Sequence, residues 1–264
     1  MLKLIDIHKT FNPGTINEKV ALNGVDLHLN EGDFVTVIGG NGAGKSTMLN
    51  AVAGAWPVDS GKIIIGGTDV TKLSEYKRAA YLGRVFQDPM TGTAATMGIE
   101  ENLALAKRRG KSRLLRPGIT RQEREEYHEL LKILGLGLED RLTSKVGLLS
   151  GGQRQALTLL MATLKKPQLL LLDEHTAALD PKTAAKVLEI TDMIVNRDHL
   201  TTMMITHNMR DAITHGNRLI MMWEGKIILD IQGEEKKKLT VKQLLDKFEE
   251  ASGEEFSNDS AILG

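Results

Sequence analysis

A short glycine-rich segment near residue 40 constrains the fold of this chain more than any other feature. Gly39-Gly40-Asn41-Gly42-Ala43-Gly44-Lys45-Ser46 matches the pattern G-x-x-x-x-G-K-[ST] at every specified position. The segment follows the apolar run Phe34–Ile38, which is typical of a parallel strand covered on both faces. A stretch with the composition of a helix, about Lys45–Ala53, comes next. Strand, glycine-rich turn and helix in this order are the context that the pattern requires.

The residue types in this turn indicate what it binds. Glycines permit a tight turn in which backbone N–H groups converge on phosphate oxygens, and the positive end of the following helix faces the same phosphates. Lys45 supplies a positive charge to the β- and γ-phosphates, and the Ser46 hydroxyl is a ligand for Mg²⁺. A glycine-rich turn that carries Lys-Ser by chance is the alternative. We expect ATP and Mg²⁺, with these nucleotide-binding residues: Gly39, Asn41, Gly42, Ala43, Gly44, Lys45, Ser46 and Thr47.

A pair of acids lies at the end of a second apolar run. Four consecutive leucines, residues 169–172, lead directly into Asp173-Glu174. Buried strands do not usually end in two carboxylates without a cation or a proton to handle. Asp173 is expected to hold Mg²⁺ through its water shell, and Glu174 to orient or deprotonate the attacking water. An acidic helix cap is the alternative, and the phosphate-binding turn upstream disfavours it.

The remaining pattern predicts an α/β fold with a mostly parallel sheet. Strands are expected at 2–7, 20–29, 63–65 and 202–206, a hairpin joins 218–222 to 226–231, and an amphipathic helix is expected at 240–250. Residues 88–147 are rich in charged and helix-favouring residues, which predicts an inserted helical subdomain. We expect one domain over 1–264: a core at 1–87 and 160–250 with an N-terminal antiparallel β element, a helical subdomain at 88–159, and a loose tail at 251–264.

Charge and composition exclude several classes of protein. Lys plus Arg and Asp plus Glu number 34 each, and this balance argues against a dedicated nucleic-acid-binding protein. The absence of cysteine excludes disulfides and thiolate metal sites. No signal peptide begins the chain, and no apolar run approaches the roughly 18–20 residues needed to cross a bilayer. Any membrane role is therefore expected to be peripheral, on the cytoplasmic face.

Four further motifs distinguish this chain from other proteins with the same phosphate-binding turn. Leu149-Ser150-Gly151-Gly152-Gln153 resembles the LSGGQ signature of ABC ATPases. Val85-Phe86-Gln87-Asp88 resembles the Q-loop of that family, Ala178-Leu179-Asp180 its D-loop, and Ile205-Thr206-His207 its switch histidine. The motifs occur in the family's order, and the resemblance covers nearly the whole chain. It implies a P-loop NTPase core, of the RecA-like kind, that hydrolyses ATP.

The resemblance also assigns roles to single residues. Phe11 is expected in a loop after the first strand, where the family stacks an aromatic ring on adenine; a core-edge phenylalanine is the alternative. Gln87 would sense the γ-phosphate or Mg²⁺ and link it to the helical subdomain. His207 would donate to the γ-phosphate, so that Glu174, His207 and Lys45 form the catalytic set.

The signature segment has a physical interpretation of its own. Its Ser-Gly-Gly sequence precedes a helix expected to begin at Gln153, which makes a second anion site of the helix-N-terminus kind. One ATP needs only one such site. The resemblance implies that two ATPs are sandwiched in a two-fold dimer. A plain helix cap is the alternative. The residues expected to contact ATP on the partner subunit are Ser150, Gly151, Gly152, Gln153 and Asp180.

Two features depart from the family or remain open. His175 stands where the family usually has proline; it would either tune Glu174 or simply face solvent, and we favour the second. The basic residues between Lys107 and Arg116 are expected to form a solvated helical face. A location near anionic lipid or a permease is the alternative.

The resemblance implies ATP hydrolysis that drives transport through a separate integral membrane permease. The subunit would act as a homodimer or paired with a similar ATPase subunit, and a substrate-binding protein would be reached through the permease. The short chain resembles bacterial importer subunits, and residues 173–183 resemble a subgroup linked to amino-acid uptake. An exporter subunit and a soluble ABC ATPase are the alternatives. The chain shows no long coiled coil and one ATPase half, which disfavours the soluble class, and Glu174 with His207 disfavours a non-catalytic sensor.

Overall fold

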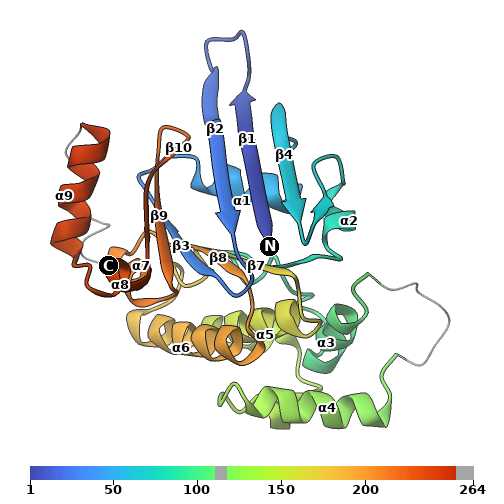
Figure 1. Ribbon diagram of the computed structural model, residues 1–264. Helices are drawn as coiled ribbons and strands as arrows, with labels where there is room; N and C mark the ends of the chain where they lie inside the picture. Colours follow the sequence, from blue (N-terminus) through green and yellow to red (C-terminus); the bar gives the residue numbers. More distant parts are fainter. Residues whose placement is uncertain (111–117, 254–264) are drawn as a thin grey trace.

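Two β-sheets pack on either side of helix α1 (Lys45–Ala53) in the computed structural model, which describes residues 1–110 and 118–253 (Figure 1). The first sheet is antiparallel in the order β2-β1-β4-β5. The second has the order β10-β9-β3-β8-β7-β6. The first sheet comprises β1 (Leu2–Phe11), β2 (Lys19–Leu29), β4 (Ser60–Ile65) and β5 (Thr68–Asp69). The second comprises β3 (Phe34–Ile38), β6 (Leu82–Val85), β7 (Leu169–Asp173), β8 (Thr202–Ile205), β9 (Arg218–Trp223) and β10 (Lys226–Gln232).

The second sheet is parallel except at one edge. Strands β9, β3, β8, β7 and β6 run in the same direction, and β10 pairs antiparallel with β9 through the expected hairpin. All five residues of β3 are buried, as a strand covered on both faces requires. The α/β fold class, the mostly parallel sheet and the N-terminal antiparallel element are therefore confirmed.

The four-leucine run of β7 is explained by the two faces of this sheet. Successive side chains on a strand point to opposite faces. Leu169 and Leu171 pack in the cluster formed with α1 and the first sheet. Leu170 and Leu172 pack in the cluster formed with α5 (Gly151–Thr163) and α6 (Pro181–Asp198). Because both faces are apolar, the strand has no polar position until it reaches Asp173.

Helices occupy most of the segment expected to be helical. Between 88 and 159 lie α3 (Ile99–Lys107), α4 (Arg121–Lys132), two short 3₁₀ turns (Glu139–Arg141 and Val146–Leu148) and most of α5. The described part of this segment contains no strand beyond one isolated bridge between Gly98 and Lys145. In Figure 1, α3 and α4 lie at the end of the molecule farthest from the antiparallel sheet. The inner faces of α3, α4 and α5 join the same apolar cluster that underlies β7.

The basic residues at the end of α3 are not a solvated face where the structure describes them. Lys107 pairs with Glu126 on α4 at 2.5 Å. Arg109 donates to the carbonyls of Ala162 and Lys165 at the end of α5, at 3.2 and 3.1 Å. That part of the prediction is wrong, because these cations tie α3 to its neighbours. The remainder of the basic run, 111–116, lies outside the described residues.

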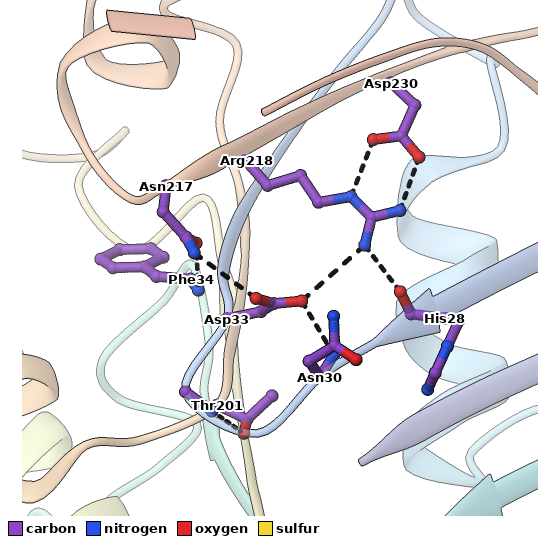
Figure 2. Close-up of polar contacts among 9 residues, drawn as sticks. His28, Asn30, Asp33, Phe34, Thr201, Asn217, Arg218 and Asp230 are labelled. Atoms are coloured by element: carbon purple, nitrogen blue, oxygen red, sulfur yellow. Dashed lines mark hydrogen bonds and ion pairs between the residues drawn. The ribbon is translucent and has the colours of Figure 1, made fainter. Parts of the chain in front are cut away.

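An ionic contact joins the two sheets at the segment that leads into β3 (Figure 2). Arg218 of β9 forms a two-pronged pair with Asp230 of β10 at 2.7 and 2.5 Å, and donates to the His28 carbonyl of β2 at 2.6 Å. Its third neighbour is Asp33, at 3.8 Å, in the turn between β2 and β3. Asp33 in turn accepts from the Asn30 backbone at 2.8 Å. The contact therefore fixes the chain where it enters β3, the strand that leads to the glycine-rich turn.

The C-terminal part of the described chain covers the hairpin edge of the second sheet. It comprises α7 (Met209–Thr214), α8 (Gly233–Lys237) and α9 (Val241–Ser252). The expected amphipathic helix is present as α9, whose Leu244 and Phe248 are buried, with Phe248 edge-on to Trp223 at 5.2 Å. The tail expected at 251–264 begins later, since 251–252 belong to α9, and 254–264 lie outside the described residues. Among the described residues, no helix is long and apolar enough to span a membrane.

Candidate nucleotide-binding and hydrolysis site

The glycine-rich turn adopts the conformation that a phosphate cradle needs. Gly39 and Gly44 have φ of +147° and +104°, and Gly44 is the N-cap of α1. A Cβ on Gly39 would lie 2.3 Å from the Met222 carbonyl oxygen, and one on Gly44 would lie 2.5 Å from that of Ala21. Both positions therefore exclude any side chain. The strand–turn–helix context predicted for this motif is confirmed.

Lys45 lies across the cradle that it helps to form. Its Nζ donates to the carbonyls of Gly39 and Gly40 at 2.6 and 3.1 Å, and the residue is only 7% exposed. Burial lowers the pKa of Lys45, while the charge of Glu174 acts in the opposite direction. The lysine thus points its charge into the turn, and a phosphate would replace the two carbonyls as its partner.

A cavity of about 340 Å³ opens on the cradle. The structure brings most of the predicted nucleotide-binding residues together here. Phe11, Glu174 and residues 41–47 line it, together with Lys19 and Ala21 of β2, which sequence reasoning had not singled out. The second strand starts at Lys19 rather than Val20, and this places the Lys19 side chain beside Gly42. No local motif marks that lysine in the sequence.

Phe11 lines the cavity, but the element that presents it differs from the prediction. It is the last residue of β1, paired with Lys19 of β2, and not part of a loop. Its ring meets Trp56 edge-on, with centroids 5.1 Å apart. The strand is longer than expected because the polar residues of β1 after Ile7 still pair with β2. A flat aromatic face at the rim of the cradle is the geometry that stacking on a base requires.

Glu174 occupies a strained position at the end of β7. Its φ is +45°, a conformation rare for residues other than glycine, and such strain gathers at functional sites. The carboxylate lines the cavity and lies 3.8 Å from Nδ1 of His207, an ion-pair contact too long for a hydrogen bond. His207 lowers the pKa of Glu174, and the carboxylate raises the pKa of His207. The pair keeps Glu174 ionised and able to accept a proton.

Asp173 turns the other way and has a cation of its own. Arg84 of β6 donates to its carboxylate at 3.1 Å, and both side chains are largely buried. Burial raises the pKa of Asp173, and Arg84 opposes this shift. Sequence reasoning assigned no strand to Leu82–Val85 and missed this arginine. The available signal was a charged residue flanked by apolar ones and followed directly by the Q-loop motif.

His175 does not face solvent, so the interpretation favoured from the sequence is wrong. It is 2% exposed, and its Nε2 lies 3.1 Å from Oγ1 of Thr191 on α6. The chain turns inward after Glu174, and the ring fills the space between β7 and α6. Burial lowers the pKa of His175 to about 4, so the ring is neutral at physiological pH.

The signature residues form a helix start of their own, away from the cradle. Helix α5 begins at Gly151, two residues earlier than expected, with Ser150 as N-cap in a reciprocal capping box with Gln153. The two glycines pack against residues on either side of Asp180: a Cβ on Gly151 would lie 3.1 Å from Cδ2 of Leu179, and one on Gly152 would lie 2.1 Å from Cγ2 of Thr183. Among the described residues that line the Lys45 cavity, none belongs to the signature, and Asp180 is also absent. Asp180 instead caps α6.

Gln87 and His207 border the site rather than fill it. Gln87 is exposed in the loop after β6 and is not among the described residues that line the cradle cavity. His207 lines a second cavity of about 570 Å³, between α6 and α7, and reaches the first only through Glu174. The structure therefore joins Lys45, Glu174 and His207 into one group and leaves Gln87 at its edge.

Fold and site together define a P-loop ATPase in which the signature residues form the start of a second, separate helix. The family model described as "ABC transporter" matches residues 22–177. A tyrosine transport ATP-binding protein of Clostridioides difficile is 44% identical over 256 residues, covering 95% of this chain and all of that protein. The chain belongs to the ABC transporter family, and it is an ATP-binding, ATP-hydrolysing cassette of that family.

Other relatives and solved structures agree with this assignment. A methionine import ATP-binding protein of Rhizobium etli is 35% identical over 232 residues; the match covers 86% of this chain but only 60% of that protein. A dimeric ATP-binding cassette in a post-hydrolysis state, bound to ADP and Pi, superposes with a TM-score of 0.74 at 28% identity. That match covers 88% of this chain and 98% of the solved one.

Proposed function

We propose that two copies of this chain, or one copy and a similar ATPase subunit, bind two ATP molecules between them and drive transport through a separate integral membrane permease. The observation that carries this proposal is the separation of the two anion sites. The cradle around Lys45 and the helix start at Ser150 do not share a cavity among the described residues, so both can serve one nucleotide only across a dimer interface. The signature residues and Asp180 then complete the partner's site.

In the proposed reaction, Lys45 and the backbone N–H groups of the turn hold the β- and γ-phosphates. Phe11 supports the base. Glu174 orients the attacking water and accepts its proton, while His207 holds Glu174 and donates to the γ-phosphate. Phosphoryl transfer needs mainly this positioning and charge stabilisation, because the protein forms no covalent bond to the phosphate.

The donors around the cradle suit Mg²⁺. Ser46, Asp173 and Gln87 offer a hydroxyl, a carboxylate and an amide oxygen, the hard ligands that this ion prefers. No group of three or more His, Cys, Asp or Glu side chains able to hold a metal occurs in the described part of the chain. Mg²⁺ would therefore take further ligands from phosphate and water, as is usual for nucleotide sites. When bound, it would neutralise charge that develops on the phosphates.

The transported solute is proposed to be an amino acid, taken up by an importer. The support is the relative named for tyrosine transport, which matches over its whole length, together with the relative named for methionine import. The subunit would lie at the cytoplasmic face of the membrane, attached through the permease. A substrate-binding protein would reach it only through the permease, and nucleic acid has no part in this function.

The variant Glu174→Gln tests the proposed reaction. The amide cannot accept a proton, so hydrolysis should fall ~10²–10⁴-fold while ATP still binds and the dimer accumulates. Turnover is measured by phosphate release and the dimer by size-exclusion chromatography, with Glu125→Gln, an exposed residue of α4, as control. Cells that carry only Glu174→Gln should also lose uptake of labelled tyrosine. Hydrolysis near the wild-type rate would remove Glu174 from the reaction, and unchanged uptake would refute the transported solute.

A further inference from the structure

Arg84 is the charged residue of β6, and its side chain is held between three elements. One NH2 group donates both to Oδ1 of Asn50 on α1, at 2.8 Å, and to Oδ2 of Asp173 at the end of β7, at 3.1 Å. The guanidinium lies over the Phe86 ring, 4.5 Å from its centroid. Only 14% of the side chain is exposed. The side chain of Arg84 thus lies between α1 and the end of β7, where Asp173 is found.

The neighbours of Arg84 are the residues proposed to hold the divalent cation. Asn50 donates from Nδ2 to the carbonyl of Ser46 at 2.8 Å, so Arg84 is linked through one side chain to the start of α1. Asp173 is its direct partner, and Gln87 follows three positions later in the chain. The arginine is therefore bonded directly to one proposed metal ligand, Asp173, and through Asn50 to a second, Ser46.

The adjacent acids Asp173 and Glu174 interact with different positively charged side chains. Glu174 interacts with His207 and Lys45 on the cavity side. Among the described residues, the ion pair of Asp173 is with Arg84 of β6, at 3.1 Å. Nε of Arg84 is buried with no hydrogen-bond partner among the described residues. The guanidinium is therefore held by one nitrogen and the Phe86 ring, a contact that a competing cation can displace.

We propose that Arg84 is the resting counter-ion of Asp173 and competes with the divalent cation for this carboxylate. This inference rests on the magnesium site proposed above. A carboxylate withdrawn from water is costly without a cation, and Arg84 supplies one when no metal is bound. Once a divalent cation approaches, the guanidinium is a like charge a few ångströms away and weakens its binding. Arg84 sets the Mg²⁺ concentration at which the nucleotide site fills.

Two charge-removing variants and one charge-conserving variant test this competition. Arg84→Met and Arg84→Gln should lower the Mg²⁺ concentration for half-maximal binding of a fluorescent ADP analogue by roughly tenfold, the effect of removing one nearby charge in a partly aqueous site. Arg84→Lys should stay within about threefold of wild type. Arg124→Met, which breaks the ion pair with Glu100 between α3 and α4, is the control and should not change the Mg²⁺ requirement. Mn²⁺ binding followed by electron paramagnetic resonance in the presence of ADP should tighten by a similar factor in Arg84→Met and Arg84→Gln.

Thermal unfolding separates competition from a merely structural role. In EDTA and without nucleotide, both charge-removing variants should melt below wild type, because Asp173 is then buried without a cation. Added Mg²⁺ and ADP should raise the melting temperature of these variants more than that of wild type. An unchanged or higher Mg²⁺ requirement in Arg84→Met and Arg84→Gln would overturn the proposal. Wild-type protein that binds ADP with no dependence on Mg²⁺ would instead refute the magnesium site itself.

Discussion

The ring of His175, the residue that follows Glu174, is buried against α6. Thr191 donates its hydroxyl hydrogen to the Val187 carbonyl at 2.8 Å, so its oxygen can only accept from His175. This requires the tautomer protonated at Nε2. Burial, reinforced by the charge of His215, lowers the pKa of His175 to about 4. The neutral ring ties the turn that carries Glu174 to α6.

This depressed pKa predicts a loss of stability in mild acid. The unfolded chain binds a proton at His175 near pH 6.5, whereas the folded chain resists until about pH 4. The contribution of His175 to the free energy of unfolding is therefore fully present above pH 6.5, the pKa of this residue in the unfolded chain. It is lost as the pH falls from 6.5 towards 4. Between pH 7.5 and pH 5 the loss should be about 2 kcal/mol.

Urea unfolding at the two pH values measures this effect. His175→Gln retains a donor for Thr191 without a titratable ring, and should lose about 2 kcal/mol less than wild type over the same interval. The exposed His28, replaced by glutamine, is the control and should behave as wild type. A parallel pH dependence in wild type and His175→Gln would show that the ring does not carry the effect.

At single residues, the sequence predicts chemistry wherever a motif constrains both residue type and position. Lys45 and Glu174 line one cavity, as expected, because the turn that carries Lys45 and the residue Glu174 each follow the C-terminal end of a buried strand of the same sheet. The contacts of Arg84 and His175 were not predicted. Arg84 bonds Asp173 on the neighbouring strand, β7. His175 contacts Thr191 on the helix α6. Such contacts depend on register and packing, which no local pattern encodes.

At the scale of the elements, helix α1 has a distinct role at each of its two ends. Its N-terminus forms the cradle, and its C-terminus is closed by Arg78, which is 2% exposed. Arg78 donates to the carbonyls of Ala51 and Val52 in α1 at 2.6 and 3.0 Å. It also donates to the carbonyls of Thr71 and Leu73 at 2.8 and 3.0 Å. Helix carbonyls without a partner are costly when buried, so this arginine is required where α1 ends.

Arg78→Met should therefore destabilise the protein without changing its chemistry. Four carbonyls lose the Arg78 donor at once, although that of Ala51 still accepts from the Gly54 N–H at 3.2 Å, and the free energy of unfolding should fall by about 2–4 kcal/mol. Urea unfolding measures the change, and nucleotide affinity should be retained while the protein stays folded. Arg121→Met, at a side chain 93% exposed, is the matched control and should cost under about 0.5 kcal/mol. A loss as small as the control's would show that water replaces Arg78 at these carbonyls.

Helices and strands could be predicted from the sequence where a long or periodic run of apolar residues indicates them. The buried apolar runs of β3 and β7 and the periodic α9 were recognised from their patterns. The strand β6 was not, because Gly83 and Arg84 interrupt a run of four residues. The four-residue α2 (Glu75–Arg78) has no periodicity to read. The order of strands in the two sheets is a long-range property, and only the general preference for parallel neighbours could be inferred.

At the scale of the whole molecule, the chain presents two helix N-termini, at Lys45 and at Gly151, that are proposed to bind phosphate in different subunits. The signature glycines pack on Leu179 and Thr183, next to the start of α6, and this contact fixes α5 relative to the segment after Glu174. The N-terminus of α5 itself remains at the surface, since Ser150 and Gly151 are exposed. An exposed anion site beside an exposed Asp180 is what a second subunit would need to complete its nucleotide site.

Two inactive variants can test this sharing of sites between subunits. Lys45→Ala removes the charge of the cradle, and Ser150→Arg blocks the signature helix start. Each homodimer lacks one half of both sites, so each variant alone should be inactive. In a mixed dimer one site combines both defects, whereas the other joins an intact Lys45 from one chain to an intact Ser150 from its partner.

Mixing the two variants should therefore restore ATPase activity or, if turnover needs both sites, ATP-dependent pairing of differently tagged chains. If both anion sites served one nucleotide within a single chain, no mixture could recover either signal. Folded variants that neither hydrolyse ATP nor pair when mixed would therefore refute the shared site.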